Sequence, residues 1–326
     1  MTATRDPGRT MSFLASMGRS MTRSTRCKRG VMEEPLTRSR AQALLHFTVF
    51  LWGTTAILGK SIQIAALPLV FYRVTLVTVL MAAVMVRRRV PFAVPWRRAV
   101  ELGGAGVLVA LHWVLFYAAV KLAGVSIAVL CLSTVTFFTA LLEPLVFKRP
   151  VKRHELVLGA LVVFGVVLLL RLEVRGSAKG YAMGLASAFF SAAFGTWNGS
   201  LIRRERAERV TLYELAAAGI ACGICFVVFG GFVAPWEVTL TDWGLLAFLA
   251  VACTLLPWLW SLRILKTLSP YTVAISVSLE PVYSILFAFL LWPNEERLTV
   301  RFYVGGALLI ALVFLNGALK GRGAAV

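Results

Sequence analysis

The chain has 326 residues, of which 59% are hydrophobic, and its formal net charge is +19. A soluble globular protein of this length could not keep so much apolar surface away from water, so that class is excluded. The positive charge does not indicate nucleic acid, because the Lys and Arg residues gather in alternate connections between apolar runs, which is a topology signal of membrane proteins.

Ten apolar runs follow one another along the chain, and many are near twenty residues, the length that crosses a bilayer as a helix. We place them at 42–60, 67–86, 99–120, 124–147, 155–171, 180–202, 211–234, 242–262, 270–292 and 301–319. The connections are too short for a folded soluble domain, and no run has the alternating pattern of a β-barrel strand. The sequence therefore predicts an all-α polytopic membrane protein with ten transmembrane helices.

The distribution of charge predicts the orientation of these helices. Of the 34 Lys and Arg residues, 26 lie in the two terminal tails and in the connections on their side of the membrane. By the positive-inside rule both termini are cytoplasmic, and we expect a plasma (inner) membrane location. The basic segment 1–40 is expected to be a disordered cytoplasmic tail. Residues 1–31 have two further interpretations, a targeting peptide or a segment that precedes a start of synthesis at Met32. Whether they belong to the mature protein is left open.

The second half of the chain repeats the first at an offset that drifts only from 141 to 147. The matched pairs are WGTTAILGK (52–60) with FGTWNGSLI (194–202), FYRVTL (71–76) with LYELAA (212–217), HWVLFYAAVKL (112–122) with PWLWSLRILKT (257–267), and LGALVV (158–163) with GGALLI (305–310). This alignment sets Arg73 opposite Glu214 and Trp113 opposite Trp258.

Because each half has an odd number of spans, the second half must enter the membrane from the opposite side. The sequence therefore predicts two inverted-topology five-helix repeats, at 41–172 and 180–320. Such repeats build secondary transporters, with a site between the halves near the bilayer midplane.

A charged residue inside an apolar run marks the candidate site. Glu280 lies ten residues past Pro270, about 15 Å along a helix, near the centre of a hydrocarbon core about 30 Å thick. A charge at that depth costs roughly 2.5–3.5 kcal/mol on insertion scales, so Glu280 is expected to face a cavity or a partner. A second Leu-Glu-Pro triplet contains Glu143, which lies near the cytoplasmic end of its span.

Polar residues accompany both acids. The spacing i, i+4, i+8, i+11 would place four residues on one side of a continuous helix, namely Thr272, Ser276, Glu280 and Tyr283. Pro281 removes an N–H and frees the carbonyl of Val277, which suits a polar cavity. The fourth run carries a similar stripe of Ser133, Thr136, Thr139 and Glu143. The alternative is that these groups hydrogen-bond neighbouring helices and serve packing alone.

Other polar and aromatic residues within the runs have two interpretations each. Arg73 either snorkels to the interface or attracts an anionic group such as a carboxylate. His112 is either a helix–helix hydrogen bonder or a proton relay. The tryptophans line a cavity or belong to aromatic belts, and those in question are Trp52, Trp113, Trp258 and Trp260.

Three further polar residues receive structural interpretations. Asn198 is expected to hold helices together. Glu214 is expected to be solvated near the cytoplasmic interface, and Lys60 is expected to snorkel.

Over about residues 41–320, the chain resembles the EamA family of the drug/metabolite transporter superfamily. The resemblance rests on LWGTTAILGK and ALPLVFYR in the first two runs, on CLSTVTFFTALLEPL in the fourth, and on LSPYTVAISVSLEPVYSILFAFLLW with the following NEERLT. It implies ten helices in two inverted repeats, cytoplasmic termini, and export or exchange of small metabolites such as amino acids.

The family's recurrent motif positions are occupied here by Trp52, Gly53, Lys60, Arg73, Pro281 and Glu296. Two positions depart from the pattern: Thr136 stands near where the family often has proline, and Arg149 where it often has glutamate. A first-half site is therefore not carried over from the family.

The preferred hypothesis is a secondary transporter that works by alternating access, with Glu280 as the proton-coupling or substrate-amine-binding group. The substrate-binding or coupling set is Glu280, Tyr283, Ser276, Arg73, Trp52, His112, Trp113, Trp258 and Thr136. The alternatives are a non-transporting membrane sensor or assembly factor, and a membrane-embedded lipid-modifying enzyme.

The chain contains no HExxH motif and no Gly-rich phosphate loop, so we expect no enzyme, metal, cofactor or ATP-driven step. The expected partners are a small-molecule substrate, membrane lipids and a coupled proton, without nucleic acid, in a monomer or homodimer. The identity of the substrate and the direction of transport remain open.

Overall fold

The computed structural model describes residues 36–151, 153–172, 177–277, 279–294, 299–300, 303–308 and 311. The body of the molecule begins at Leu36, and residues 1–35 are a separate unit. The predicted tail up to residue 35, most of the tenth predicted run, and Glu296 lie outside the described residues.

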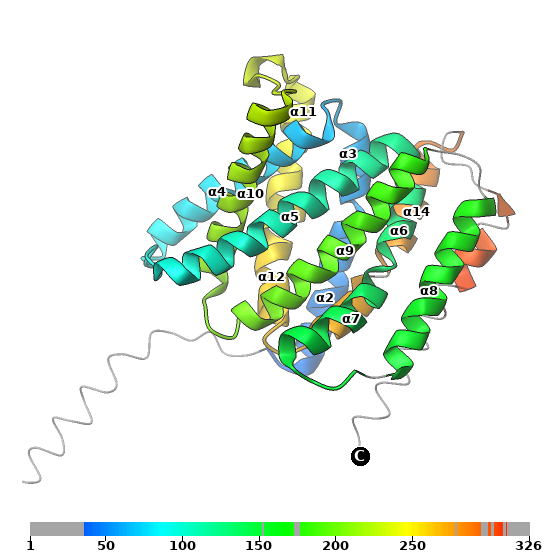
Figure 1. Cartoon of the computed structure of the whole chain (residues 1–326). Coiled ribbons are helices and arrows are strands. Elements are labelled where there is room, and N and C mark those ends of the chain that lie inside the picture. Colours follow the sequence, from blue (N-terminus) through cyan, green and yellow to red (C-terminus); the bar gives the residue numbers. More distant parts are fainter. Residues whose placement is uncertain are drawn as a thin grey trace, which may run out of the picture. The chain divides into compact units, whose positions relative to one another are not determined.

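The described part of the chain contains helices and no strand, as the sequence predicts (Figure 1). Its elements are α2 (Arg38–Gly53), α3 (Thr55–Ser61), α4 (Ala66–Arg87), α5 (Trp96–Ala123), α6 (Val125–Leu132), α7 (Val135–Phe147), α8 (Arg153–Leu172), α9 (Ala178–Leu201), α10 (Ala207–Phe229), η2 (Pro235–Glu237), α11 (Leu240–Ala250), η3 (Val251–Leu255), α12 (Leu256–Ile264), α13 (Pro270–Val277) and α14 (Glu280–Leu291).

Seven segments of the described chain are long and apolar enough to cross a bilayer, which makes this a multi-pass membrane protein. They are Arg38–Ser61, Ala66–Arg87, Trp96–Ala123, Val125–Phe147, Ala207–Phe229, Leu240–Ile264 and Pro270–Leu291. The predicted fifth and sixth spans correspond to α8 and α9, which are helices but do not belong to this set. In α9 the many Gly, Ala and Ser residues, with Lys179 and Asn198, lower the hydropathy. The number of ten spans therefore stays a prediction.

Four of these segments are interrupted in the middle. The hydroxyl of Thr54 donates to the carbonyl of Leu51 at 2.7 Å, at the junction of α2 and α3. The hydroxyl of Thr134 donates to the carbonyl of Cys131 at 2.7 Å, between α6 and α7. Such side-chain bonds compete with the helical ladder. A π-helical turn, η3, separates α11 from α12.

The fourth interruption is the one that proline predicts. Helix α13 ends at Val277, and α14 begins at Glu280 with Pro281 in its first turn. This result corrects the predicted stripe, because the spacing from Thr272 to Tyr283 assumed one continuous helix. Residues before and after the break do not share one helical face.

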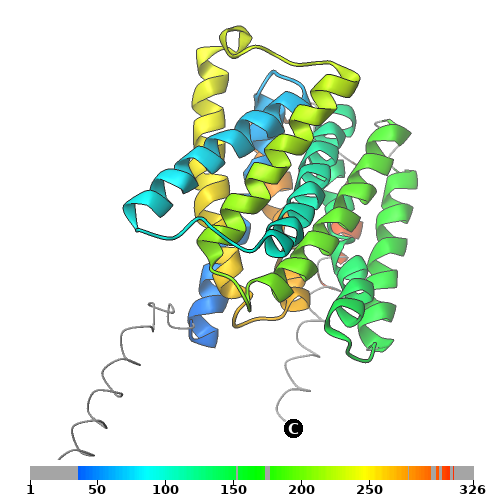
Figure 2. The same ribbon diagram turned by 60° about the vertical axis from the view of Figure 1, so that its left-hand side comes forward.

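Helices from the two halves of the chain interleave in the bundle (Figures 1 and 2). Helix α5 lies along α9 and α10, α4 lies along α10, and α7 contacts α9 and α13. Gly106 permits the closest of these approaches, since a Cβ there would lie 2.2 Å from the carbonyl oxygen of Glu214. The interior between the halves is therefore built from residues far apart in sequence.

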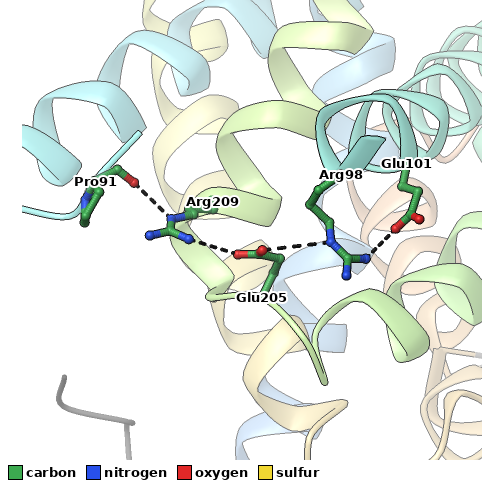
Figure 3. Close-up of polar contacts among 5 residues, drawn as sticks. All are labelled: Pro91, Arg98, Glu101, Glu205 and Arg209. Carbon is green, nitrogen blue, oxygen red and sulfur yellow. Dashed lines mark hydrogen bonds and ion pairs between the residues drawn. The ribbon is translucent and has the colours of Figure 1, made fainter. Parts of the chain in front are cut away.

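A chain of ion pairs joins the two halves at one end of the bundle (Figure 3). Glu205, between α9 and α10, pairs with Arg98 of α5 at 3.9 Å and with Arg209 of α10 at 3.3 Å. Arg98 also pairs with Glu101, and Arg209 donates to the carbonyl of Pro91 at 2.9 Å. These contacts hold the α4–α5 connection against the start of α10.

Candidate functional site

A cavity of about 110 Å³ lies among ten helices of the bundle. It is lined by Trp52, Thr55, Arg73, His112, Trp113, Phe116, Leu132, Val135, Thr139, Ser191, Phe194, Gly195, Thr196, Asn198, Trp258, Ser261, Leu265, Pro270, Val273, Ala274, Val277 and Glu280. A water molecule needs about 10–15 Å³ of such space, so the cavity holds roughly nine water-sized groups. This is the size of a small metabolite.

Arg73 of α4 is the basic residue of the cavity wall, and its side chain is almost fully buried. Its Nε donates to Thr254 Oγ1 at 2.7 Å, and its Nη1 donates to the Tyr117 hydroxyl at 2.7 Å. The guanidinium also lies over the ring of Trp113, 3.9 Å from its centre. Arg73 therefore does not snorkel to the interface, and its charge is held in place from three sides.

The π-helical turn explains why Thr254 can reach Arg73. Within η3 the Thr254 hydroxyl donates to the carbonyl of Leu249 at 2.6 Å, five residues back. This bond orients the hydroxyl so that it accepts from Arg73. Single π turns inside helices often mark functional positions.

Aromatic rings form much of the remaining wall. Trp113 and Trp258, which the repeat alignment sets opposite each other, contact edge to face with ring centres 5.3 Å apart. Phe194 stacks on Trp258 at 5.5 Å. The cavity thus offers flat apolar surfaces next to a fixed positive charge.

His112 of α5 lies beside these rings and is bonded to α9. Its Nδ1 is 2.8 Å from the hydroxyl of Ser187 and 3.0 Å from the Ser187 carbonyl oxygen. The Ser187 hydroxyl also lies 3.0 Å from the carbonyl oxygen of His112, to which it can donate. These contacts agree with the helix–helix interpretation, and the proton-relay interpretation stays a prediction.

Glu280 is the acidic residue of the cavity wall, and its side chain is 4% exposed. It is the first residue of α14, where the helix dipole favours a negative charge. Arg73 lines the same cavity. In the described part of the chain, no hydrogen bond or ion pair occupies the Glu280 carboxylate, which leaves it available to a ligand.

Three of the predicted site residues lie outside the cavity wall. The Thr136 hydroxyl donates to the carbonyl of Ala274 at 3.5 Å and so connects α7 with α13. The Ser276 hydroxyl donates to the carbonyl of Thr272 at 3.3 Å. Tyr283 packs edge to face against Phe50, with ring centres 5.4 Å apart.

Glu143, the other Leu-Glu-Pro acid, has a structural partner at each side. Its Oε2 accepts a hydrogen bond from the backbone N–H of Tyr271 at 3.0 Å and pairs with Arg149 at 3.2 Å. It therefore caps the start of α13. Lys60 lies over the ring of Trp292, 4.6 Å from its centre, so its charge has a partner besides water.

The expectation that Glu214 is solvated is wrong, because its side chain is completely buried. Its Oε2 accepts hydrogen bonds from Asn198 Nδ2 at 3.3 Å and from Trp258 Nε1 at 3.2 Å. Sequence reasoning missed this cluster, although the alignment of Arg73 with Glu214 was a signal. Arg73 contacts Trp113, Glu214 contacts Trp258, and the two tryptophans contact each other.

Comparison with known proteins identifies the class. The model of the EamA-like transporter family matches residues 40–171 and 178–318, which gives the chain the family's two-repeat architecture. The chain therefore belongs to the EamA-like transporter family, part of the drug/metabolite transporter superfamily, as its motifs indicated. Membership in a transporter family is consistent with the expectation that the chain is not an enzyme.

One solved structure, described as "Crystal structure of protein", has a TM-score of 0.66 and 20% sequence identity. The match covers 89% of this chain and 100% of that chain. At this identity the likeness shows the shared fold alone. No curated protein sequence matches the chain.

Proposed function

We propose that the protein is a secondary transporter that exports or exchanges small metabolites such as amino acids, by alternating access around the cavity. The observation that carries this proposal is the cavity wall itself. Arg73 and Glu280 supply opposite charges to one cavity, and Trp52, Trp113 and Trp258 supply apolar faces. A zwitterionic solute with an apolar side chain matches all three features.

The two charges have different tasks in this mechanism. Arg73 is fixed by Thr254 and Tyr117, so it offers a preorganised partner to a substrate carboxylate. Among the described residues no hydrogen-bond or ion-pair partner occupies the Glu280 carboxylate, so we assign to it either the substrate amine or a coupled proton. Exchange of those two ligands on one carboxylate would couple substrate movement to proton movement.

The inverted repeat, with halves at 41–172 and 180–320, provides the two states. Helix α6 ends at Leu132 and α7 begins at Val135, whereas α13 ends at Val277 and α14 begins at Glu280, each 145 residues later. This is the offset at which the sequences align, so the interruptions support symmetry-related halves. Discontinuous helices facing a midplane cavity are typical of such transporters.

The residues near the two ends of the bundle support an inward-facing state. Its lining includes Leu265 and Pro270, at the α12–α13 connection. At the other end, Lys121 Nζ donates to the carbonyl of Ile62 at 2.8 Å, and the N–H of Gln63 donates to Asp242 at 3.1 Å. With both termini cytoplasmic in the plasma membrane, the α12–α13 end faces the cytoplasm.

Transport in proteoliposomes tests the proposal. The purified chain, as monomer or homodimer, would be offered labelled amino acids and related metabolites with and without an imposed pH gradient. Wild type would be compared with Glu280→Gln and with Glu101→Gln, whose carboxyl is half exposed. We expect gradient-driven uptake by wild type and Glu101→Gln and its loss in Glu280→Gln.

Unchanged uptake by Glu280→Gln would overturn its coupling role and leave Arg73 and the tryptophans as the site. No uptake of any solute by wild type would favour the sensor or assembly-factor hypothesis.

A further inference from the structure

The buried cluster around Glu214 contains two polar atoms that lack a partner. Asn198 Nδ2 and Trp258 Nε1 both donate to Glu214 Oε2. Within the described residues, Glu214 Oε1 and Asn198 Oδ1 have no hydrogen-bond partner, although both are buried. Two unpaired acceptors in an apolar interior are costly, so each needs an explanation.

The orientation of the Asn198 amide follows from the same contacts. In the opposite orientation the amide oxygen would lie 3.3 Å from Oε2, and a hydrogen bond there would require a proton on the oxygen that already accepts from Trp258. The amide nitrogen therefore faces Oε2, and the amide oxygen is the second unpaired acceptor. Since Trp258 also donates to Oε2, a further hydrogen on the carboxyl belongs on Oε1.

We propose that Glu214 binds a proton on Oε1 and forms a two-bond acid–amide pair with Asn198. In this pair the amide N–H donates to Oε2, and the carboxyl O–H donates to the amide oxygen. A single proton thereby satisfies both unpaired atoms. It adds no volume, which fits two atoms that are closed off from solvent.

Among the described residues, the hydrogen-bond partners of the Glu214 carboxyl are uncharged. The groups that act on its carboxyl are Asn198 and Trp258, both uncharged. The buried or half-buried basic residues on the helices packed against α10 include Arg73 on α4, His112 on α5 and Arg263 on α12. Within the described part of the chain, none of these three forms a hydrogen bond or ion pair with Glu214.

Asn198 and Trp258 also line the cavity, so Glu214 lies directly behind its wall. Release of the proton would place a negative charge there and break one bond of the pair. This makes Glu214 a second proton-binding carboxyl in addition to Glu280. Its part in coupling rests on the proposed function, whereas its protonation does not.

Infrared spectroscopy of the purified protein, without substrate, tests the protonation directly. A protonated carboxyl gives a C=O band that is separate from the bands of a carboxylate and shifts in D₂O. We expect such a band in wild type and a loss of intensity from it in Glu214→Gln, measured as the difference between the two spectra. The matched control is Glu208→Gln, on the same helix, because the buried Glu208 carboxylate pairs with Arg88 and Arg206. We expect the band to remain in that variant.

A second variant tests the pair itself and serves if Glu214→Gln does not fold. In Asn198→Leu the carboxyl loses its amide partner, so the band of Glu214 should move toward the frequency of a carboxyl free of hydrogen bonds. The proposal is overturned if Glu214→Gln removes no intensity from the protonated-carboxyl band, if that variant loses a carboxylate band instead, or if Asn198→Leu leaves the frequency unchanged. A negative transport assay would not affect any of these outcomes.

Discussion

The clearest stability prediction concerns the buried guanidinium of Arg73. Arg73→Lys keeps the charge but replaces a planar group with five donors by a single nitrogen. The guanidinium makes two hydrogen bonds of 2.7 Å and lies 3.9 Å from the centre of the Trp113 ring. Lysine can keep at most one of the two hydrogen bonds.

The magnitude follows from these contacts. A hydrogen bond to a charged group contributes about 1.5–3 kcal/mol, and a desolvated cation–π contact contributes about 2 kcal/mol. Losing one bond and part of the ring contact therefore gives an expected destabilisation of roughly 2–4 kcal/mol.

The measurement is the free energy of unfolding in mixed detergent micelles. Arg88→Lys is the matched control, because the Arg88 side chain is 55% exposed and pairs with Glu208 at 3.7 Å, a contact worth at most about 1 kcal/mol. If Arg73→Lys unfolds with the same free energy as Arg88→Lys, the guanidinium is not the anchor described above. If it is destabilised as expected, binding of carboxylate solutes should weaken as well.

Three other predictions concern contacts between elements of the bundle. Thr254→Val removes the acceptor of Arg73 Nε and should lower the free energy of unfolding by about 1–3 kcal/mol. An unchanged free energy of unfolding would contradict the role of the π turn. Gly106→Ala adds a Cβ that would lie 2.2 Å from a carbonyl oxygen of α10, so it should destabilise the fold. Gly223→Ala is the control and should not, because open space surrounds Gly223. Equal thermal stability of the two variants would contradict the close approach of α5 and α10. Glu205→Gln breaks the ion-pair chain of Figure 3 at its central carboxylate and should lower stability by about 1 kcal/mol or less at low salt. High salt should remove that difference, and a difference that persists would show that the contact is not electrostatic.

Several features could be predicted from local sequence because they depend on chemistry within one segment. The length and apolarity of the runs require helices in a bilayer, since backbone polar groups have no other partner there. Pro281 interrupts its helix because proline lacks the N–H that the ladder needs. The depth of Glu280 within its run likewise predicted a cavity or a partner, and Glu280 lines the cavity.

The environment of Glu214 was decided by tertiary structure. The predicted span began at residue 211, which put Glu214 at the interface, but α10 begins at Ala207 and carries it two turns inward. Its partners Asn198 and Trp258 come from two other helices, and no local pattern records that meeting. The side of a helix that faces the cavity also depends on where the helix breaks, as Ser276 and Tyr283 illustrate. Sequence by itself determined which segments are apolar enough to form helices in a membrane. Packing between distant helices decided which polar atoms meet, because a hydrogen bond needs ångström-scale positions that spacing along one chain does not define.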